Sequence, residues 1–208
     1  MRSSLHIGVL ALQGDFERHL RQLHLLNVSG REVRCREELS GLDGLIIPGG
    51  ESTAMNELID RFAMRDALGD FIRTRVVWGT CAGSILLARE VDDRRIRPFG
   101  AMDISVIRNG YGRQIHSFYA EITARLNGDT RLLRASFIRA PIIARYGNGV
   151  MVLAEYGGRP VLLEQPNCMV STFHTELHDN PLLTTYFLDK IISRGRPKSA
   201  SSAYRSVS

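Results

Sequence analysis

A cysteine flanked by small residues is the first feature of this sequence that could carry chemistry. Gly79-Thr80-Cys81-Ala82-Gly83 follows the apolar run at 76–78 and precedes a helix-like segment. Small residues at this point permit a tight strand-to-helix turn that pushes the central side chain out of the sheet, as in a nucleophile elbow. The amides of the following helix would favour thiolate over thiol. We therefore predict that Cys81 is a nucleophile; the alternative is a small core residue in a glycine-containing turn.

A histidine two residues before a glutamate could serve such a nucleophile. His174 and Glu176 come just after a predicted strand at 168–172, and residues two apart in an extended segment point the same way. Glu176 can then accept a hydrogen bond from one imidazole nitrogen while the other nitrogen faces Cys81, which fixes the tautomer and stabilises the imidazolium. A base held in this way typically contributes about 10² to 10⁴ in rate. Without the cysteine, the same pair would be interpreted as a surface pair.

A glycine-rich loop supplies a third group of residues. Pro48-Gly49-Gly50-Glu51-Ser52 follows another apolar run and precedes a helical pattern, so it should lie at the carboxyl edge of the sheet, where open α/β folds bind ligands. The adjacent Gly49 and Gly50 let backbone N–H groups approach a developing oxyanion, and the amide of Ala82 is a natural second donor. We predict an oxyanion hole built from these amides, although a plain strand-to-helix connection could have the same sequence.

A metal site is the competing interpretation of the histidine region. Imidazole and carboxylate both suit zinc, and the residues concerned are Cys168, His174, Glu176 and His178. Their spacing matches no zincin pattern and His178 falls near a predicted helix start, so we expect no metal and no other cofactor. Four further residues are interpreted as local structure: His19 and His24 on or beside an amphipathic helix, His116 near a strand, and Cys35 in a strand.

The elements that must position these residues begin with apolar runs that alternate with helical patterns. The runs lie at 6–10, 44–47 and 76–78, with a further short strand predicted at 32–35. Apolar residues at helical spacing follow them: Phe16, Leu20 and Leu23, then Met55, Ile59 and Phe62, then 85–88. Buried strands that alternate with helices indicate a parallel sheet covered on both faces.

The middle of the chain changes to the alternating period of half-exposed strands. Strands are predicted at 102–106, 118–124, 150–154, 159–164 and 168–172. Asn180-Pro181 then predicts a helix start, because a side-chain cap precedes proline at the first helical position. The buried stripe of this last helix is Leu183, Phe187 and Ile191. The predicted fold class is α/β, with a mostly parallel central sheet and additional antiparallel strands.

Composition and charge exclude several classes of protein. The 208 residues are 44% hydrophobic and 24% charged, which is typical of one globular domain and not of a disordered or fibrous chain. The formal charge of +5 comes mostly from residues 189–208, where five basic residues stand against Asp189 alone. We therefore predict a single domain at 1–193, a basic, disordered tail at 194–208, and no nucleic-acid partner.

The cysteines and the hydropathy pattern indicate the cellular compartment of the protein. Three cysteines make an odd count without C-x-x-C spacing, which argues against a disulfide framework and favours a reducing compartment. No apolar run approaches the roughly 18 residues that a bilayer requires. We predict a cytoplasmic protein that does not bind a membrane.

Taken together, the three motifs resemble the class I, or triad, glutamine amidotransferases. Within that superfamily the sequence is more closely similar to the PdxT/SNO family, the glutaminase subunits of pyridoxal 5'-phosphate synthase. The resemblance covers residues 6–192 and rests on five motifs in order: Leu10-Ala11-Leu12-Gln13-Gly14, the segment 48–53, Trp78-Gly79-Thr80-Cys81-Ala82-Gly83, the segment 108–114 beginning Arg108-Asn109-Gly110-Tyr111, and Phe137-Ile138-Arg139-Ala140-Pro141.

This resemblance implies a fold and a set of roles. The fold would be the three-layer, flavodoxin-like fold of class I glutamine amidotransferases, with Cys81 as nucleophile, His174 as base and Glu176 as its orienting acid. An arginine fork suits the carboxylate of an amino-acid substrate. The residues that would hold L-glutamine are Gly50, Glu51, Ser52, Arg108, Ile138 and Arg139.

The resemblance also implies a reaction and a partner. The family hydrolyses glutamine through a glutamyl thioester and passes ammonia to a separate synthase subunit, which builds the vitamin B6 ring from phosphosugars. The two subunits would form a hetero-oligomer, in which docking of the synthase orders the oxyanion loop and raises the glutaminase activity.

Two departures from the family pattern and one segment without a clear alignment leave alternatives open. Thr175 stands where the family usually has proline and Ser84 where an apolar residue is common, while Glu90–Phe99 does not align clearly. Threonine lacks the fixed φ of proline, so the loop could be less rigid. One alternative is therefore a catalytically silent structural partner of the synthase; the other is an amidotransferase that serves a different acceptor, which the segments 108–114 and 137–141 weigh against.

Overall fold

The computed structural model describes residues 2–108, 110, 117–178 and 180–195. The strands of its larger sheet are β1 His6–Leu10, β2 Ser29–Val33, β3 Gly44–Ile47, β4 Val76–Thr80, β7 Ser117–Leu126, β8 Asp129–Ile138, β10 Met151–Tyr156, β11 Arg159–Gln165 and β12 Cys168–Ser171. Among the described residues they form nine strands in the order β2-β1-β3-β4-β12-β11-β10-β7-β8. The first five pair in parallel, and the others pair antiparallel.

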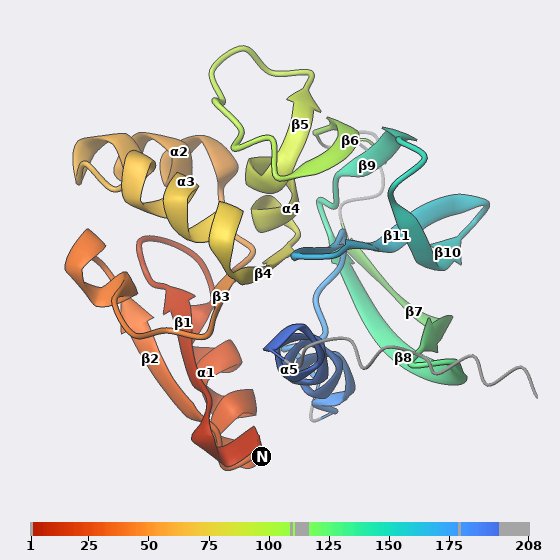
Figure 1. Cartoon of the computed structure of the whole chain (residues 1–208). Coiled ribbons are helices and arrows are strands. Elements are labelled where there is room, and N and C mark those ends of the chain that lie inside the picture. Colours follow the sequence, from red (N-terminus) through yellow and green to blue (C-terminus); the bar gives the residue numbers. More distant parts are fainter. Residues whose placement is uncertain (1, 109, 111–116, 179, 196–208) are drawn as a thin grey trace, which may run out of the picture.

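Helices cover both faces of this sheet. They are α1 Phe16–Leu25, α2 Ser52–Arg61, α3 Arg65–Thr74, α4 Ala82–Leu87 and α5 Leu182–Gly195. Because side chains alternate along a strand, neighbouring residues of β4 belong to different cores. Trp78 packs in one core with α1 and α5, and Val77 packs in the other with α2, α3 and α4. Figure 1 shows these layers, which confirm the predicted three-layer α/β arrangement.

A second, smaller sheet extends the core that contains Val77. Its strands are β5 Ala88–Val91, β6 Met102–Ile107 and β9 Ile142–Tyr146, in the order β5-β6-β9. The alternating residues Met102, Ile104 and Val106 of β6 point into that core. Within the described residues, none of the helices is long and apolar enough to cross a membrane.

The predicted elements agree with the structure apart from a few differences. The strand expected at 32–35 lies at Ser29–Val33, an exposed edge whose polar residues hide its pattern. The helix expected to reach Ala88 ends at Leu87, and Ala88 begins β5. The helix start at Asn180 is confirmed, since its side chain accepts from the amide of Leu182. The sequence interpretation missed α3, β5, β8 and β9. Of the tail predicted at 194–208, the first two residues lie in α5, which ends at Gly195, and the rest lies outside the described residues.

Candidate active site

Three neighbouring parallel strands end where the predicted site residues begin. Ile47 of β3 pairs with Gly79 of β4, and Thr80 of β4 pairs with Ser171 of β12. The loops that follow these strands therefore leave the sheet side by side at its carboxyl edge. This register brings the glycine-rich loop, the cysteine and the histidine together, although they lie far apart in the sequence.

Cys81 occupies a sharp bend between β4 and α4. Its φ of 46° and ψ of −104° are unusual for a residue with a side chain, and such conformations cost about 1–3 kcal/mol unless the surroundings impose them. The amide of Cys81 donates to the carbonyl of Ser171 at 2.8 Å, and a Cβ on Gly83 would overlap the carbonyl of Ile47. The buried hydroxyl of Ser84 donates to the Cys81 carbonyl at 2.6 Å. The serine that departs from the family pattern at this position therefore supports the bend.

His174 and Glu176 form the predicted hydrogen-bonded pair. Nδ1 of His174 lies 2.6 Å from Oε1 of Glu176, whose side chain is completely buried. The His174 amide and carbonyl form an antiparallel bridge with Ser136 of β8, at 2.9 and 3.0 Å. Because this bridge fixes the backbone and Glu176 fixes Nδ1, the ring is held from two sides and its Nε2 faces the cysteine.

Electrostatics favour a charged pair at this point. Burial alone would lower the pKa of His174, but hydrogen bonds with Cys81 and Glu176, and their charge, raise that pKa to about 10. Burial alone would raise the pKa of Glu176, yet the attraction and hydrogen bonds of His19 and His174 hold that pKa below its usual range. The geometry therefore suits an imidazolium flanked by a carboxylate.

The other two cysteines lie in different surroundings. Cys81 lines the cleft, and its Sγ lies 3.9 Å from the carbonyl of Ile138. Cys168 is completely buried at the start of β12, and burial raises the pKa of its thiol to about 12. Cys35 lies at the beginning of a 3₁₀ turn and outside the residues that line the cleft. Of the three, only Cys81 therefore combines access to the cleft with a histidine partner.

The glycine-rich loop packs directly on His174. A Cβ on Gly49 would overlap the His174 ring, so glycine is required for this close approach. The amide of Glu51 donates to Oε1 of Gln13 at 2.7 Å, and the Glu51 carboxylate accepts from two amides at the start of α2. The loop is thus tied to both α2 and the loop after β1.

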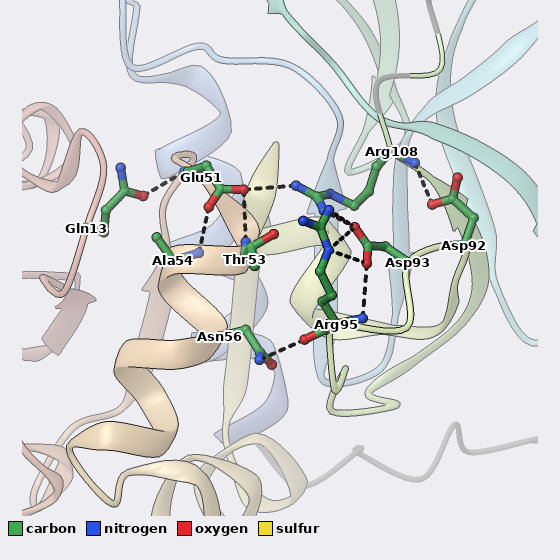
Figure 2. Close-up of polar contacts among 9 residues, drawn as sticks. All are labelled: Gln13, Glu51, Thr53, Ala54, Asn56, Asp92, Asp93, Arg95 and Arg108. Carbon is green, nitrogen blue, oxygen red and sulfur yellow. Dashed lines mark hydrogen bonds and ion pairs between the residues drawn. The ribbon is translucent and has the colours of Figure 1, made fainter.

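Ion pairs form a second wall of the cleft. Figure 2 shows Glu51 between Gln13 and Arg108, and Arg95 and Arg108 both directed at Asp93. Arg108 lies 2.9 Å from Glu51 through one guanidinium nitrogen and bonds Asp93 through another. The predicted substrate arginine is therefore already held between two carboxylates. Hydrogen bonds from Arg95, followed by one from Arg108, hold the pKa of Asp93 well below its usual range despite some desolvation.

A single cleft of about 310 Å³ collects the predicted residues. It is lined by Cys81 and His174, by the loop residues Gly49, Gly50, Glu51 and Ser52, and by Ala82, Arg108, Ile138 and Arg139. Glu176 lies behind His174 and does not line it. Arg139 has a φ of +44°, at the end of the long β7–β8 hairpin. The predicted segment at 109 and 111–114 lies outside the described residues.

Sequence reasoning missed several residues at this site. Gln13 lines the cleft, as do Ile85 and Leu177, and His19, interpreted as local structure, contacts Glu176 from α1. The position of Gln13 three residues after the buried strand β1 was the available signal, while nothing in the helical pattern distinguished His19. Cys168 lies at the opposite end of β12 from His174, and no three His, Cys, Asp or Glu side chains of the described ranges are arranged to hold a metal.

The chain resembles known proteins over most of its length. The model of the SNO glutamine amidotransferase family matches residues 9–193. A pyridoxal 5'-phosphate synthase subunit PdxT from Solibacter usitatus is 46% identical over 89% of this chain and 98% of its own length. A protein of the same description from Thermus thermophilus is 42% identical over 88% of this chain and 96% of its own.

Solved structures have the same fold. One described as a glutamine amidotransferase is 40% identical and has a TM-score of 0.82, covering 89% of this chain and 98% of its own. A putative GMP synthase protein from Thermoplasma acidophilum is 18% identical and has a TM-score of 0.63, covering 91% and 94%. At that lower identity, the likeness concerns the fold alone.

Proposed function

The chain belongs to the SNO glutamine amidotransferase family, and from this premise we propose that Cys81, His174 and Glu176 are its catalytic triad. The chain acts as the glutaminase subunit of a pyridoxal 5'-phosphate synthase: it uses L-glutamine and works with a separate synthase subunit. The observation that supports the triad is the buried 2.6 Å hydrogen bond of His174 to Glu176, beside a cysteine on a strained bend.

The proposed reaction has two steps. The Cys81 thiolate attacks the side-chain carboxamide carbon of glutamine, and the oxygen becomes an oxyanion that accepts from the amides of Gly49, Gly50 and Ala82. His174 gives its proton to the leaving nitrogen, so ammonia departs and a glutamyl thioester remains. His174 then takes a proton from water, whose oxygen attacks the thioester; the C–S bond breaks and glutamate is released.

The rest of the cleft binds the amino-acid end of the substrate in this proposal. Arg108 interacts with the α-carboxylate, and the loop residues Gly50, Glu51 and Ser52 lie beside it with Ile138 and Arg139. Since Arg108 already pairs with Glu51 and Asp93, the substrate carboxylate shares or replaces one of these contacts. A docked synthase subunit can control this exchange of Arg108 contacts.

Two further parts of the proposal concern the whole chain. Residues 1–193 make up one amidotransferase domain, which is supported by the two cores that run through its described part. The protein is cytoplasmic, which is supported by three cysteines that all remain free thiols.

The test is ammonia release from glutamine by the complex with the synthase subunit. Cys81→Ala should lower kcat by at least about 10³-fold, since loss of a nucleophile removes the covalent route, while circular dichroism and synthase binding stay as in the wild type. Cys35→Ala is the matched control and should retain activity. A glutamine-analogue affinity label should modify Cys81 in preference to Cys35 and Cys168.

Two outcomes would contradict the proposal. A wild-type complex that assembles but releases no ammonia would favour the silent structural partner. Equal labelling of all three cysteines would show that the bend confers no special reactivity on Cys81.

A further inference from the structure

One buried histidine outside the triad contacts its acid. His19 lies on α1 with no exposed surface, and its Nε2 is 3.5 Å from Oε1 of Glu176. The same nitrogen is 3.4 Å from the hydroxyl of Thr80, the residue before the nucleophile. The rings of His19 and Trp78 pack edge to face, with their centroids 5.5 Å apart. His19 therefore stands behind the triad, on the side away from the cleft.

The surroundings of Glu176 explain why such a neighbour matters. A buried carboxylate is costly unless hydrogen bonds or charges compensate for the lost water. Oε1 accepts from His174, but Oε2 has no partner in the described part of the chain. The titratable groups that face this carboxylate are His174 from its own loop and His19 from α1, so His19 is its second source of positive potential.

The tautomer of His19 follows from its own contacts. Nδ1 is buried and has no partner among the described residues, so a proton there would be an unsatisfied donor. Nε2 faces the Glu176 carboxylate, which can only accept, and the Thr80 hydroxyl, which can accept as well. The proton therefore belongs on Nε2, directed at Glu176.

A second polar residue on the same face of α1 holds the backbone of the catalytic loop. Nε2 of Gln22 donates to the carbonyls of Thr175 and His178, each at 3.2 Å, and its Oε1 accepts from Thr184 at 2.5 Å. Residues three apart on a helix are neighbours, so His19 and Gln22 act on one loop. Gln22 fixes the main chain at the position where threonine replaces proline, and His19 fixes the carboxylate.

We propose that His19 is a positioning residue for glutamine hydrolysis, which holds Glu176 ionised and directed at His174 through its buried Nε2–H. An apolar residue would pack against Trp78 without leaving Nδ1 unsatisfied, so packing alone does not account for a histidine here. The inference rests on the proposed function, because Glu176 has a role only if His174 is the base.

The test measures kcat and KM for glutamine across pH with the synthase complex. His19→Leu should lower kcat about 10-fold or more with little change in KM, because a misdirected orienting acid weakens the base. Loss of its potential raises the pKa of Glu176, so the acid limb of kcat should move up by about one pH unit. His19→Gln, whose amide N–H can reach the place of Nε2–H, should restore most of the rate and the limb.

A control separates positioning from simple destabilisation. Gln22→Met loosens the loop backbone at Thr175 and His178 but keeps the contact of His19 with Glu176, so it should lower Tm and kcat and leave the acid limb in place. The proposal is overturned if His19→Leu has the kcat and the acid limb of the wild type. It is also overturned if the kcat of His19→Gln is as low as that of His19→Leu while the two variants have the same Tm. Failure of the wild-type complex to release ammonia would instead contradict the proposed function.

Discussion

The two walls of the cleft are built from different interactions. On the triad wall, the Glu176 side chain is fully buried and that of His174 is 10% exposed. On the second wall, the Glu51 side chain is 44% exposed, and Arg108 and Asp93 form an ion pair with side chains that are 15% and 17% exposed. Water and salt weaken exposed ion pairs far more than buried hydrogen bonds. The buried wall around His174 is therefore preformed, whereas the exposed wall around Arg108 can exchange partners.

Glu176→Gln tests the buried wall and should have the largest effect. The amide removes the charge that stabilises the imidazolium and can offer His174 a donor in place of an acceptor, so kcat should fall by about 10² to 10⁴-fold. KM should change little, because Glu176 does not line the cleft. Steady-state ammonia release measures both. Glu164→Gln is the matched control, since that carboxylate also pairs with a side chain that bears a proton, Lys190; it should lower Tm and preserve kcat.

Arg108→Gln tests the exposed wall and should act mainly on KM. A hydrogen bond with a charged partner contributes about 1.5–3 kcal/mol, which corresponds to a rise in KM of about 10 to 100-fold. The KM of Arg108→Lys should lie between those of the wild type and Arg108→Gln, because lysine keeps the charge and loses the planar fork. A fall in kcat with unchanged KM would place Arg108 in the chemistry and erase the difference between the walls. Arg95→Gln serves as the control, because it also removes a hydrogen-bond partner of Asp93 but leaves Arg108 in place.

The parallel half of the fold was predictable because its pattern is local. Each buried strand is a continuous apolar run followed by a helical period, as at Gly44–Ile47 before α2. The β7–β8 hairpin also had a signal that was overlooked: Asn127 and Gly128 connect its strands with φ values of 53° and 87°, and Asn-Gly is the strongest short hairpin signal. No comparable local signal marks β5, since Arg89 and Glu90 are exposed and the strand forms by pairing with β6.

At the site, the spacing of residues predicted the geometry better than the electrostatics. Small residues around Cys81 and the two-residue step from His174 to Glu176 are local features that determine direction. The contact of His19 with Glu176 joins residues 157 positions apart, and an amphipathic helix accounts for a histidine equally well without it. The pairing of Arg108 with Asp93 likewise depends on how β6 packs beside the preceding loop, in the segment that aligns poorly with the family.

Asp93→Asn should have the smallest effect and gives the finest test of the exposed wall. Asp93 holds one side of the Arg108 guanidinium while Glu51 holds the other, and one ion pair near the surface contributes about 0.2–1 kcal/mol. KM should therefore rise only about 2 to 5-fold, with kcat unchanged. High salt should raise the wild-type KM in the same direction and have less effect on the variant.

The double variant makes the sign of this effect decisive. In Arg108→Gln, the carboxylates of Asp93 and Glu51 lose their shared cation and face an incoming substrate carboxylate, which repels it. Adding Asp93→Asn removes one of these charges, so KM should fall relative to Arg108→Gln alone, although Asp93→Asn raises KM in the wild type. Such a reversal requires Asp93 to act through Arg108. An additive rise in KM would show instead that Asp93 acts on the substrate or the loop independently, and that the exposed wall is as fixed as the buried one.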